Sequence, residues 1–209
     1  MTAELRSEQP AVVIKVGGSL FTLPDFPERL SKLLDALEHQ HRLLVVGGGK
    51  AADVVREWDA VHHLTEQESH ILAVRSMSLT AQFVARLLSA PVVYSMGEAV
   101  QSWTSANGPI TQILDVASDV LLRDGLEELP KSWDVTSDAI AAWLARSART
   151  ADLLFVKSVD WNSGHDWTAA VESDHIDAHT PVEIARFNDA QRIGWANLRS
   201  DNPRVEWLR

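Results

Sequence analysis

The amino-acid sequence predicts a three-layer α/β/α sandwich around a mostly parallel, open sheet. Two observations predict it: short apolar runs rich in β-branched residues, and helical stretches of ten or more residues that alternate with these runs. Parallel strands need a crossover between them, so this alternation implies a sheet covered by helices on both faces. Because the 209 residues are 45% hydrophobic, we expect one core and a single domain over residues 1–209.

Each expected strand is a short apolar run bounded by turn residues. After a polar lead-in over residues 1–10, strands are expected at residues 11–16, 43–46, 91–94, 110–116 and 153–157. The first two runs break into glycine, at Gly17-Gly18 and at Gly47-Gly48-Gly49. Closing strands are expected at residues 192–198 and 205–208.

The expected helices carry apolar residues on one side. Two such stripes define the first helices: Leu30, Leu33, Leu34 and Leu37, and then Ala51, Val54, Val55 and Trp58. A longer apolar helix is expected over residues 65–88, with Thr65 and Glu68 as a capping box. An alanine-rich helix follows over residues 139–145, with Thr136 or Ser137 as its N-cap.

Residues 161–185 lack a clear apolar period, so we expect a polar excursion rather than part of the core. His175 and His179 have the i, i+4 spacing of a metal-binding pair on a helix. Pro181 and the polar surroundings favour a solvated loop instead.

Composition narrows the class of protein. The formal net charge of −10 repels a nucleic-acid backbone, so we expect no nucleic-acid partner. The absence of cysteine excludes disulfides and thiolate metal sites. No stretch approaches the ~20 apolar residues of a membrane span, and residues 1–6 lack the features of a signal peptide. We therefore expect a cytoplasmic protein without a membrane partner.

The two glycine turns indicate a site for phosphate groups. Glycine allows backbone N–H groups to come close to a ligand, and ligands bind beyond the carboxyl ends of parallel strands. Lys15 lies inside the first apolar strand, two residues before Gly17, where an ammonium is costly to bury without an anionic partner. A phosphate chain is one such partner; the alternative is a lysine on an edge strand that reaches solvent.

Two common phosphate-binding schemes fit the second glycine turn poorly. A Walker A loop fails because Leu44 stands where its first glycine belongs and Ala51 follows Lys50. Residues 47–52 match the dinucleotide pattern G-x-G-x-x-A. That scheme needs an acidic residue at the end of a following strand, whereas Glu66 and Glu68 lie in helical sequence, and it leaves Lys15 unexplained.

Four segments, in order, resemble the amino acid kinase family, which includes the aspartate, glutamate and uridylate kinases. They are Val-Ile-Lys-Val-Gly-Gly-Ser-Leu at 13–20, Val-Val-Gly-Gly-Gly-Lys at 45–50, Thr-Ser-Asp-Ala-Ile-Ala-Ala-Trp-Leu-Ala at 136–145, and Leu-Leu-Phe-Val-Lys-Ser-Val-Asp at 153–160. The resemblance implies an open α/β/α sandwich, ATP and Mg²⁺ as cofactors and a small anionic acceptor. It also implies a homodimer or higher homo-oligomer, for which the helix over residues 65–88 is a candidate interface.

Within the family, the short chain and three of its segments are most similar to the archaeal-type kinase of methanofuran biosynthesis. The segments are Ser132-Trp133-Asp134, Lys157-Ser158-Val159-Asp160 and the Asp177–Pro181 region. This resemblance implies a phosphomonoester acceptor of the aminomethylfuran-methyl phosphate type.

The family resemblance also implies roles for individual residues. Lys15 would hold the transferred phosphoryl group, Asp138 would orient the lysines or bind Mg²⁺, and Lys157 would be the second cation. The implied phosphate and nucleotide ligands are Gly17, Gly18, Ser19, Ser158 and Asp160. The implied acceptor ligands are Gly47, Gly48 and Gly49. From their positions on expected helices, Arg75 or Arg56 is a candidate for binding an acceptor phosphate and His70 for lying near it; the alternative is that these are solvated helix residues. Trp133 and Trp161 flank the motifs and are expected to wall the site.

Two departures from the family pattern keep other functions open. The chain has no late Gly-Gly-Met-x-x-Lys segment, from which many relatives take a second catalytic lysine, and Trp161 follows Asp160 where relatives place glycine. The alternatives are a degenerate nucleotide-binding or regulatory paralogue and, with less support, a dinucleotide-dependent oxidoreductase.

Overall fold

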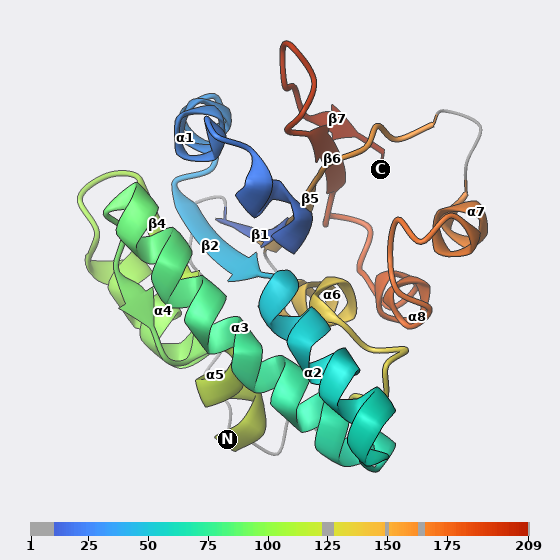
Figure 1. The fold of residues 1–209 in the computed structure, drawn as a ribbon. Helices are drawn as coiled ribbons and strands as arrows, with labels where there is room; N and C mark the ends of the chain where they lie inside the picture. The colour runs from blue at the N-terminus through green and yellow to red at the C-terminus, as the bar shows by residue number, and fades with distance from the viewer. Residues whose placement is uncertain (1–10, 123–127, 149–150, 163–165, 209) are drawn as a thin grey trace.

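A seven-stranded sheet organises the computed structural model, which describes residues 11–122, 128–148, 151–162 and 166–208. Its strand order is β3-β4-β2-β1-β5-β6-β7, and every pairing is parallel except that of β6 with β7 (Figure 1). The strands are β1 (Ala11–Val16), β2 (His41–Val46), β3 (Val92–Val93), β4 (Ile110–Leu114), β5 (Ala151–Lys157), β6 (Ile193–Asn197) and β7 (Glu206–Trp207). The predicted mostly parallel sheet is confirmed; the expected lead-in over residues 1–10 lies outside the described residues.

β1 is the central strand of this sheet. All of its residues are buried, and Lys15 lies in register with Val45 of β2 and Phe155 of β5. The alternative of an edge-strand lysine that reaches solvent is therefore wrong.

The helices of the described residues cover both faces of the sheet and its carboxyl edge. They are the 3-10 helix η1 (Gly18–Thr22), then α1 (Phe26–Asp35), α2 (Lys50–His62), α3 (Glu66–Leu88), α4 (Met96–Ser105), α5 (Val116–Leu122), α6 (Ser137–Ala148), α7 (Trp167–Glu172) and α8 (Thr180–Ile184). The capping box at the start of α3 is confirmed: Glu68 N–H donates to the Thr65 hydroxyl, and the Glu68 carboxylate accepts from the Thr65 N–H.

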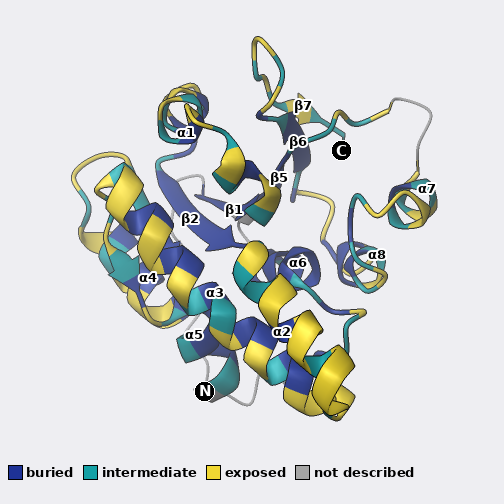
Figure 2. Ribbon diagram, in the orientation of Figure 1, coloured by how far each residue is buried: buried dark blue, intermediate teal, exposed yellow. Residues whose placement is uncertain are grey.

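Side chains alternate between the two faces, as the period of a strand requires. In β1 and β5, odd-numbered residues such as Val13 and Phe155 pack with α4, α5 and α6, whereas even-numbered residues such as Ile14 pack with α1. α3 crosses between the faces, because Val74 and Met77 belong to the first cluster while later residues of the helix belong to the second. Figure 2 shows α6 almost entirely buried and α2 largely exposed.

α2 is more exposed than its apolar pattern predicts. Val55 is buried, but Val54 and Trp58, expected on the same covered side, are exposed. The reason is that α2 packs mainly against α3 and does not lie on the sheet.

Two helices that pack beside β4 were not expected from the sequence. α4 begins at the N-cap Ser95, whose hydroxyl accepts from the N–H of Glu98, so the Ser-x-x-Glu pattern was an available signal. α5 begins at Val116, which was expected to end a strand. Both helices are short, and their apolar residues fill the space beside β4.

The segment over residues 161–185 is not only a polar excursion. It forms α7 and α8 and buries Ala170, Ile176 and Ile184 in the core cluster of the α6 face. Glu183 of α8 is fully buried, and Arg146 of α6 donates to it at 2.8 Å. A polar segment can join the core here because its buried charge is paired.

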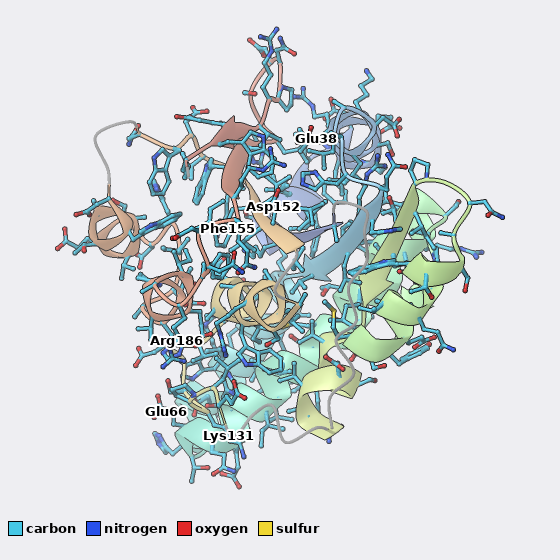
Figure 3. All side chains as sticks on the ribbon, turned by 180° about the vertical axis from the view of Figure 1, so that it is seen from behind. Glu38, Glu66, Lys131, Asp152, Phe155 and Arg186 are labelled. Carbon is cyan, nitrogen blue, oxygen red and sulfur yellow. The ribbon has the colours of Figure 1, made fainter. Side chains whose placement is uncertain are left out.

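A polar cluster fastens the amino edge of the sheet, opposite the glycine turns. The Asp152 carboxylate contacts His39 Nε2 at 2.9 Å and accepts from Arg192 Nε at 2.8 Å. Arg192 also contacts Glu38 at 2.7 Å, and Glu38 and Asp152 lie near each other in Figure 3. The cluster joins the starts of β2, β5 and β6, which fixes the relative position of these strands.

Among the described helices, α3 satisfies the length and composition of a membrane span, with a mean hydropathy of 1.3 over its most apolar window. A third of that window is buried inside the protein. A helix in the core of a globular domain passes the same test, so the finding is weak evidence for a membrane.

Candidate functional site

The two glycine turns lie against each other at the carboxyl edge of the sheet. Gly47 N–H donates to the Val16 carbonyl at 2.9 Å, and Gly17 N–H donates to the Val156 carbonyl at 2.9 Å. A Cβ atom on Gly18 would lie 2.4 Å from the backbone of Gly49. The close contact between the two turns therefore requires glycine at position 18, whether or not a ligand binds there.

The second turn is confined on its other sides as well. A Cβ atom on Gly47 would lie 3.0 Å from the Ser137 hydroxyl, and one on Gly48 would lie 2.8 Å from the Ser76 hydroxyl. Gly49 has φ of 52°, a left-handed conformation that favours glycine, and α2 begins at the next residue. The start of α2 therefore lies at the carboxyl edge of the sheet, and a helix N-terminus favours an anion.

Lys15, Asp138 and Lys157 meet beside the first glycine turn. The Asp138 carboxylate contacts Lys15 Nζ at 2.9 Å and Lys157 Nζ at 2.7 Å. The two lysines come from adjacent strands and face α6, which supplies the carboxylate. Lys15 and Asp138 are each 5% exposed, and Lys157 is 8% exposed. Two ammonium groups therefore share one carboxylate in an environment with almost no solvent.

Burial dominates the titration of this cluster. It lowers the pKa of Lys157 from an ordinary value of 10.5 to about 7, although the Asp138 charge opposes the change. Burial alone would raise the pKa of Asp138, but the charges of Lys15 and Lys157 outweigh it and hold that pKa below its ordinary value. Asp138 is therefore ionised at neutral pH, whereas Lys157 lies near the midpoint of its titration.

The start of α6 is capped by Thr136 and by Asp177 from a distant part of the chain. Thr136, one of the two expected N-caps, directly precedes α6, and its hydroxyl accepts from the N–H of Asp138 at 3.5 Å while donating to Asp177. The N–H of Ala139 donates to Asp177 at 3.0 Å, so Asp177 shares the acceptor role of the N-cap side chain. Sequence pattern could not reveal this, because the capping carboxylate is 38 residues from Ala139.

A cavity of about 550 Å³ opens beside both glycine turns. Its apolar wall includes Val74, Met77 and Ile140. The remaining lining residues are Gly18, Ser19, Thr22, Gly47, Gly48, Gly49, Lys50, Ala52, Asp53, Arg56, His70, Ala73, Trp133, Val135, Thr136, Ser137 and Arg199. The volume is in the range of small-molecule sites.

Three cationic side chains line this cavity. Lys50 follows the second glycine turn, and Arg56 lies over the Trp133 ring at 4.6 Å from its centroid. Arg199 donates to the Ser19 carbonyl and to the Thr22 hydroxyl, each at 2.9 Å. Arg199 was not predicted, because only the folded chain brings the loop after β6 to the first glycine turn.

Other predicted residues divide into those at the cavity and those away from it. Arg75 is exposed on α3 and is not part of the cavity lining, so of the two candidate arginines only Arg56 is placed for an acceptor. Trp133 walls the cavity as expected. Trp161 does not; its ring packs against Trp167 and Trp195, with centroids 4.9 and 5.2 Å away.

His70 contributes a neutral imidazole to the cavity wall. Its Nε2 lies 3.0 Å from the Val135 carbonyl, and because a carbonyl only accepts, Nε2 carries the proton. Burial lowers the pKa of His70, which keeps the ring neutral at physiological pH. Its Nδ1 has no hydrogen-bond partner among the described residues.

The predicted nucleotide residues lie around the end of β5. The Ser19 hydroxyl is 3.2 Å from the Ser158 hydroxyl, which joins the first glycine turn to this strand end. Asp160 accepts from the Asn197 amide at 3.0 Å, so its carboxylate also connects β5 to the end of β6. Asn197 further accepts from the N–H of Arg199 at 2.9 Å. Asn197 thereby links Asp160, a predicted residue, to Arg199, which lines the cavity.

No group of three metal-ligating side chains occurs within residues 11–122, 128–148, 151–162 and 166–208. His179 precedes α8 and His175 lies in the preceding loop, so the pair does not share a helix face. Asp138 contacts two ammonium groups, which favours its role in orienting lysines over a role as a metal ligand.

The contact between the glycine turns generates a stability prediction. Gly18→Ala should lower the free energy of unfolding by at least about 2 kcal/mol, because its Cβ would overlap the Gly49 backbone. Gly17→Ala is the matched control: its Cβ would have only ordinary contacts, at 3.4 Å or more, so a loss of less than about 1 kcal/mol is expected. Urea denaturation measures both, and equal losses would contradict the assigned contact.

The lowered pKa of Lys157 generates a pH prediction. Between pH 7 and 10.5 the unfolded chain binds a proton at Lys157 that the folded chain has released, so the free energy of unfolding rises with pH across this window. Below pH 7 the folded and unfolded chains both bind that proton, so the contribution of Lys157 to the free energy of unfolding no longer changes with pH. Denaturation of wild type and Lys157→Met at pH 7, 8 and 9 should show the steeper rise in wild type; parallel curves would refute the burial assignment.

Known proteins resemble this chain in sequence and in fold. A kinase of Methanocaldococcus jannaschii, [5-(aminomethyl)furan-3-yl]methyl phosphate kinase, is 24% identical over 153 residues, which cover 71% of this chain and 66% of that relative. Uridylate kinase from Archaeoglobus fulgidus superposes with a TM-score of 0.59 at 16% identity, covering 88% of this chain and 89% of the other. UMP kinase from Bacillus anthracis superposes with a TM-score of 0.62 at 10% identity, covering 97% and 100%.

Aspartate kinase from Synechocystis superposes with a TM-score of 0.61 at 14% identity, covering 95% of this chain and 40% of the other. At these identities the solved structures show a shared fold. The model of the amino acid kinase family matches residues 10–161, well over half of the sequence. The resemblance found in the sequence is thereby confirmed, and the chain belongs to the amino acid kinase family.

Proposed function

We propose that this protein, a single domain over residues 1–209, transfers the γ-phosphoryl group of ATP to a small anionic acceptor in the cytoplasm. One observation carries the proposal: two ammonium groups share one buried carboxylate beside two glycine turns and a cavity of about 550 Å³. Phosphoryl transfer needs little covalent chemistry from the protein, and this arrangement supplies positioning and charge stabilisation. Family membership supports the same reaction class.

Each part of the site has a defined task in this proposal. Lys15 and Lys157 stabilise the charge that develops on the transferred group, while Asp138 holds both ammonium groups in place. Backbone N–H groups of the glycine turns, with the hydroxyls of Ser19 and Ser158, bind phosphate oxygens. ATP fits a site of this kind; Mg²⁺ would be held mainly by its phosphates, because the described residues offer no cluster of metal ligands.

The acceptor would occupy the cavity, with its anionic group near Lys50 and Arg56. The apolar wall formed by Val74, Met77 and Ile140 accommodates a small apolar body. We propose a phosphomonoester, of the type named for the Methanocaldococcus jannaschii relative. The support for this finer assignment is the similarity to that relative and the cationic rim of the cavity.

The two alternatives make different predictions for ligands. A degenerate paralogue would bind Mg-ATP without turnover. A dinucleotide-dependent oxidoreductase would respond to NADH, but the acidic residues considered for ribose binding lie at the start of α3, where Glu68 caps its own helix. The charge cluster around Lys15 also has no task in that scheme.

Lys15→Ala tests the proposed reaction. Phosphoryl transfer, measured as ADP release with phosphorylated acceptors, should fall by on the order of 10²–10³-fold, because one stabilising cation is removed. Lys32→Ala, which changes an exposed lysine of α1, is the control and should keep full activity.

Saturating Mg-ATP at ~100 times its dissociation constant should increase the free energy of unfolding of the wild-type protein by about 2.7 kcal/mol. Full turnover in Lys15→Ala would refute the assignment.

We propose that the protein forms a homodimer, as family resemblance implies. The outward face of α3 exposes large apolar side chains, which suits an interface. The neighbouring helix α2 exposes further large apolar side chains, so the candidate interface residues on the two helices are Val54, Trp58, Val61, Leu72, Leu79, Phe83 and Leu87.

Leu79→Glu tests the proposed dimer. Leu79 is 66% exposed in the isolated chain, so a charge there should leave the fold intact but disrupt an apolar interface. Sedimentation velocity should show a dimer for wild type and a monomer for Leu79→Glu. Val182→Glu, an exposed apolar residue of α8 outside this set, should remain dimeric. A monomeric wild type would exclude the interface.

A further inference from the structure

Asp177 joins the starts of two helices through one carboxylate. On the α6 side, one oxygen accepts from the Thr136 N–H at 2.8 Å, the Thr136 hydroxyl at 2.7 Å and the Ala139 N–H at 3.0 Å. On the α8 side, the other oxygen accepts from the His179 N–H at 3.2 Å and from the Thr180 N–H and hydroxyl, both at 2.8 Å. The loop before α8 is thus fastened to the beginning of α6.

The fastened part of α6 is the part that carries Asp138. Thr136 and Ala139, which both donate to Asp177, stand on either side of Asp138 in the chain. A carboxylate at a helix start is also favoured by the helix dipole. Since backbone N–H groups bordering Asp138 are held by Asp177, the position of the Asp138 carboxylate depends on that contact.

The same loop reaches Lys157. The His175 carbonyl accepts from Lys157 Nζ at 2.6 Å, two residues before Asp177. Asp174, the residue before His175, has φ of 55°, the left-handed conformation that aspartate tolerates better than most residues. The loop therefore constrains the Lys157 ammonium directly and the Asp138 carboxylate through α6.

We propose that Asp177 is a positioning residue for phosphoryl transfer: it fixes the geometry of the Lys15, Asp138 and Lys157 cluster without touching the reacting groups. Its functional consequence rests on the proposed kinase activity. Displacements of about 1 Å at such a cluster are expected to lower the rate of the chemical step far more than they change substrate affinity.

The two threonines provide matched variants. Thr136→Val and Thr180→Val each remove one hydroxyl that donates to Asp177, from the α6 side and from the α8 side respectively. Both should lower the melting temperature similarly. Thr136→Val should lower kcat by on the order of 10-fold or more with KM for ATP within about 2-fold, whereas Thr180→Val should keep kcat within about 2-fold.

Two further variants show whether Thr136→Val lowers kcat by displacing the Lys15, Asp138 and Lys157 cluster or by changing the shape of the cavity. Thr136 also lines the cavity, so Thr136→Ser, which keeps the hydroxyl and removes the methyl group, should restore kcat. Asp177→Ala, at a residue outside the cavity lining, should lower kcat at least as much as Thr136→Val. If Asp177→Ala fails to fold, the threonine pair still decides the question. Equal kcat for the two valine variants would overturn the proposal.

A structural readout keeps this inference separate from the proposed function. Wild type that transfers no phosphoryl group to any phosphorylated acceptor would refute the kinase activity alone. Crystal structures of the two valine variants would then decide the inference. The contact between Asp138 and Lys157, 2.7 Å in wild type, should lengthen in Thr136→Val and remain in Thr180→Val. An unchanged contact in both variants would overturn the positioning role.

Discussion

The shared contact of two lysines with the Asp138 carboxylate is the interaction on which the rest of the site depends. Each ammonium is costly to bury, and a single carboxylate offsets part of that cost for both. With both lysines protonated, the cluster keeps one net positive charge in a nearly dry environment, where it attracts an anion strongly. β1 and β5 are neighbours with matched register, so their lysines reach the same point under α6. The sheet order therefore determines where the charge lies.

The glycine turns place this charge beside a cavity. Because Gly18 and Gly49 touch, the strand ends of β1 and β2 remain close together, and the chain leaves toward η1 and α2 in different directions. The space that opens beyond them is lined by apolar residues of α3 and α6 and by cations from separate parts of the chain. One close backbone contact thus serves the fold and the proposed site.

The C-terminal third of the chain contacts the Lys157 ammonium and the helix start that carries Asp138. Relatives that carry a late Gly-Gly-Met-x-x-Lys segment take a second lysine from it, whereas here Lys157 of β5 contacts the Asp138 carboxylate. The loop before α8 holds both of these residues, through the His175 carbonyl and the Asp177 carboxylate. The segment over residues 161–185 has a polar sequence, but it is buried at the places where its charged side chains are paired. The contact of Glu183 with Arg146 is a second example.

The sequence by itself determined most of the strands, the long helices and the two glycine turns at which the candidate site lies. Buried strands and amphipathic helices leave periodic signals within a few residues, and glycine marks the turns between them. Only the tertiary structure decided which side chains meet: Asp138 as the partner of Lys15, Asp177 as a second cap of α6 besides Thr136, and Arg199 rather than Arg75 at the cavity. These pairs are far apart in the chain, and their contacts depend on how helices pack on the sheet, which no local pattern records.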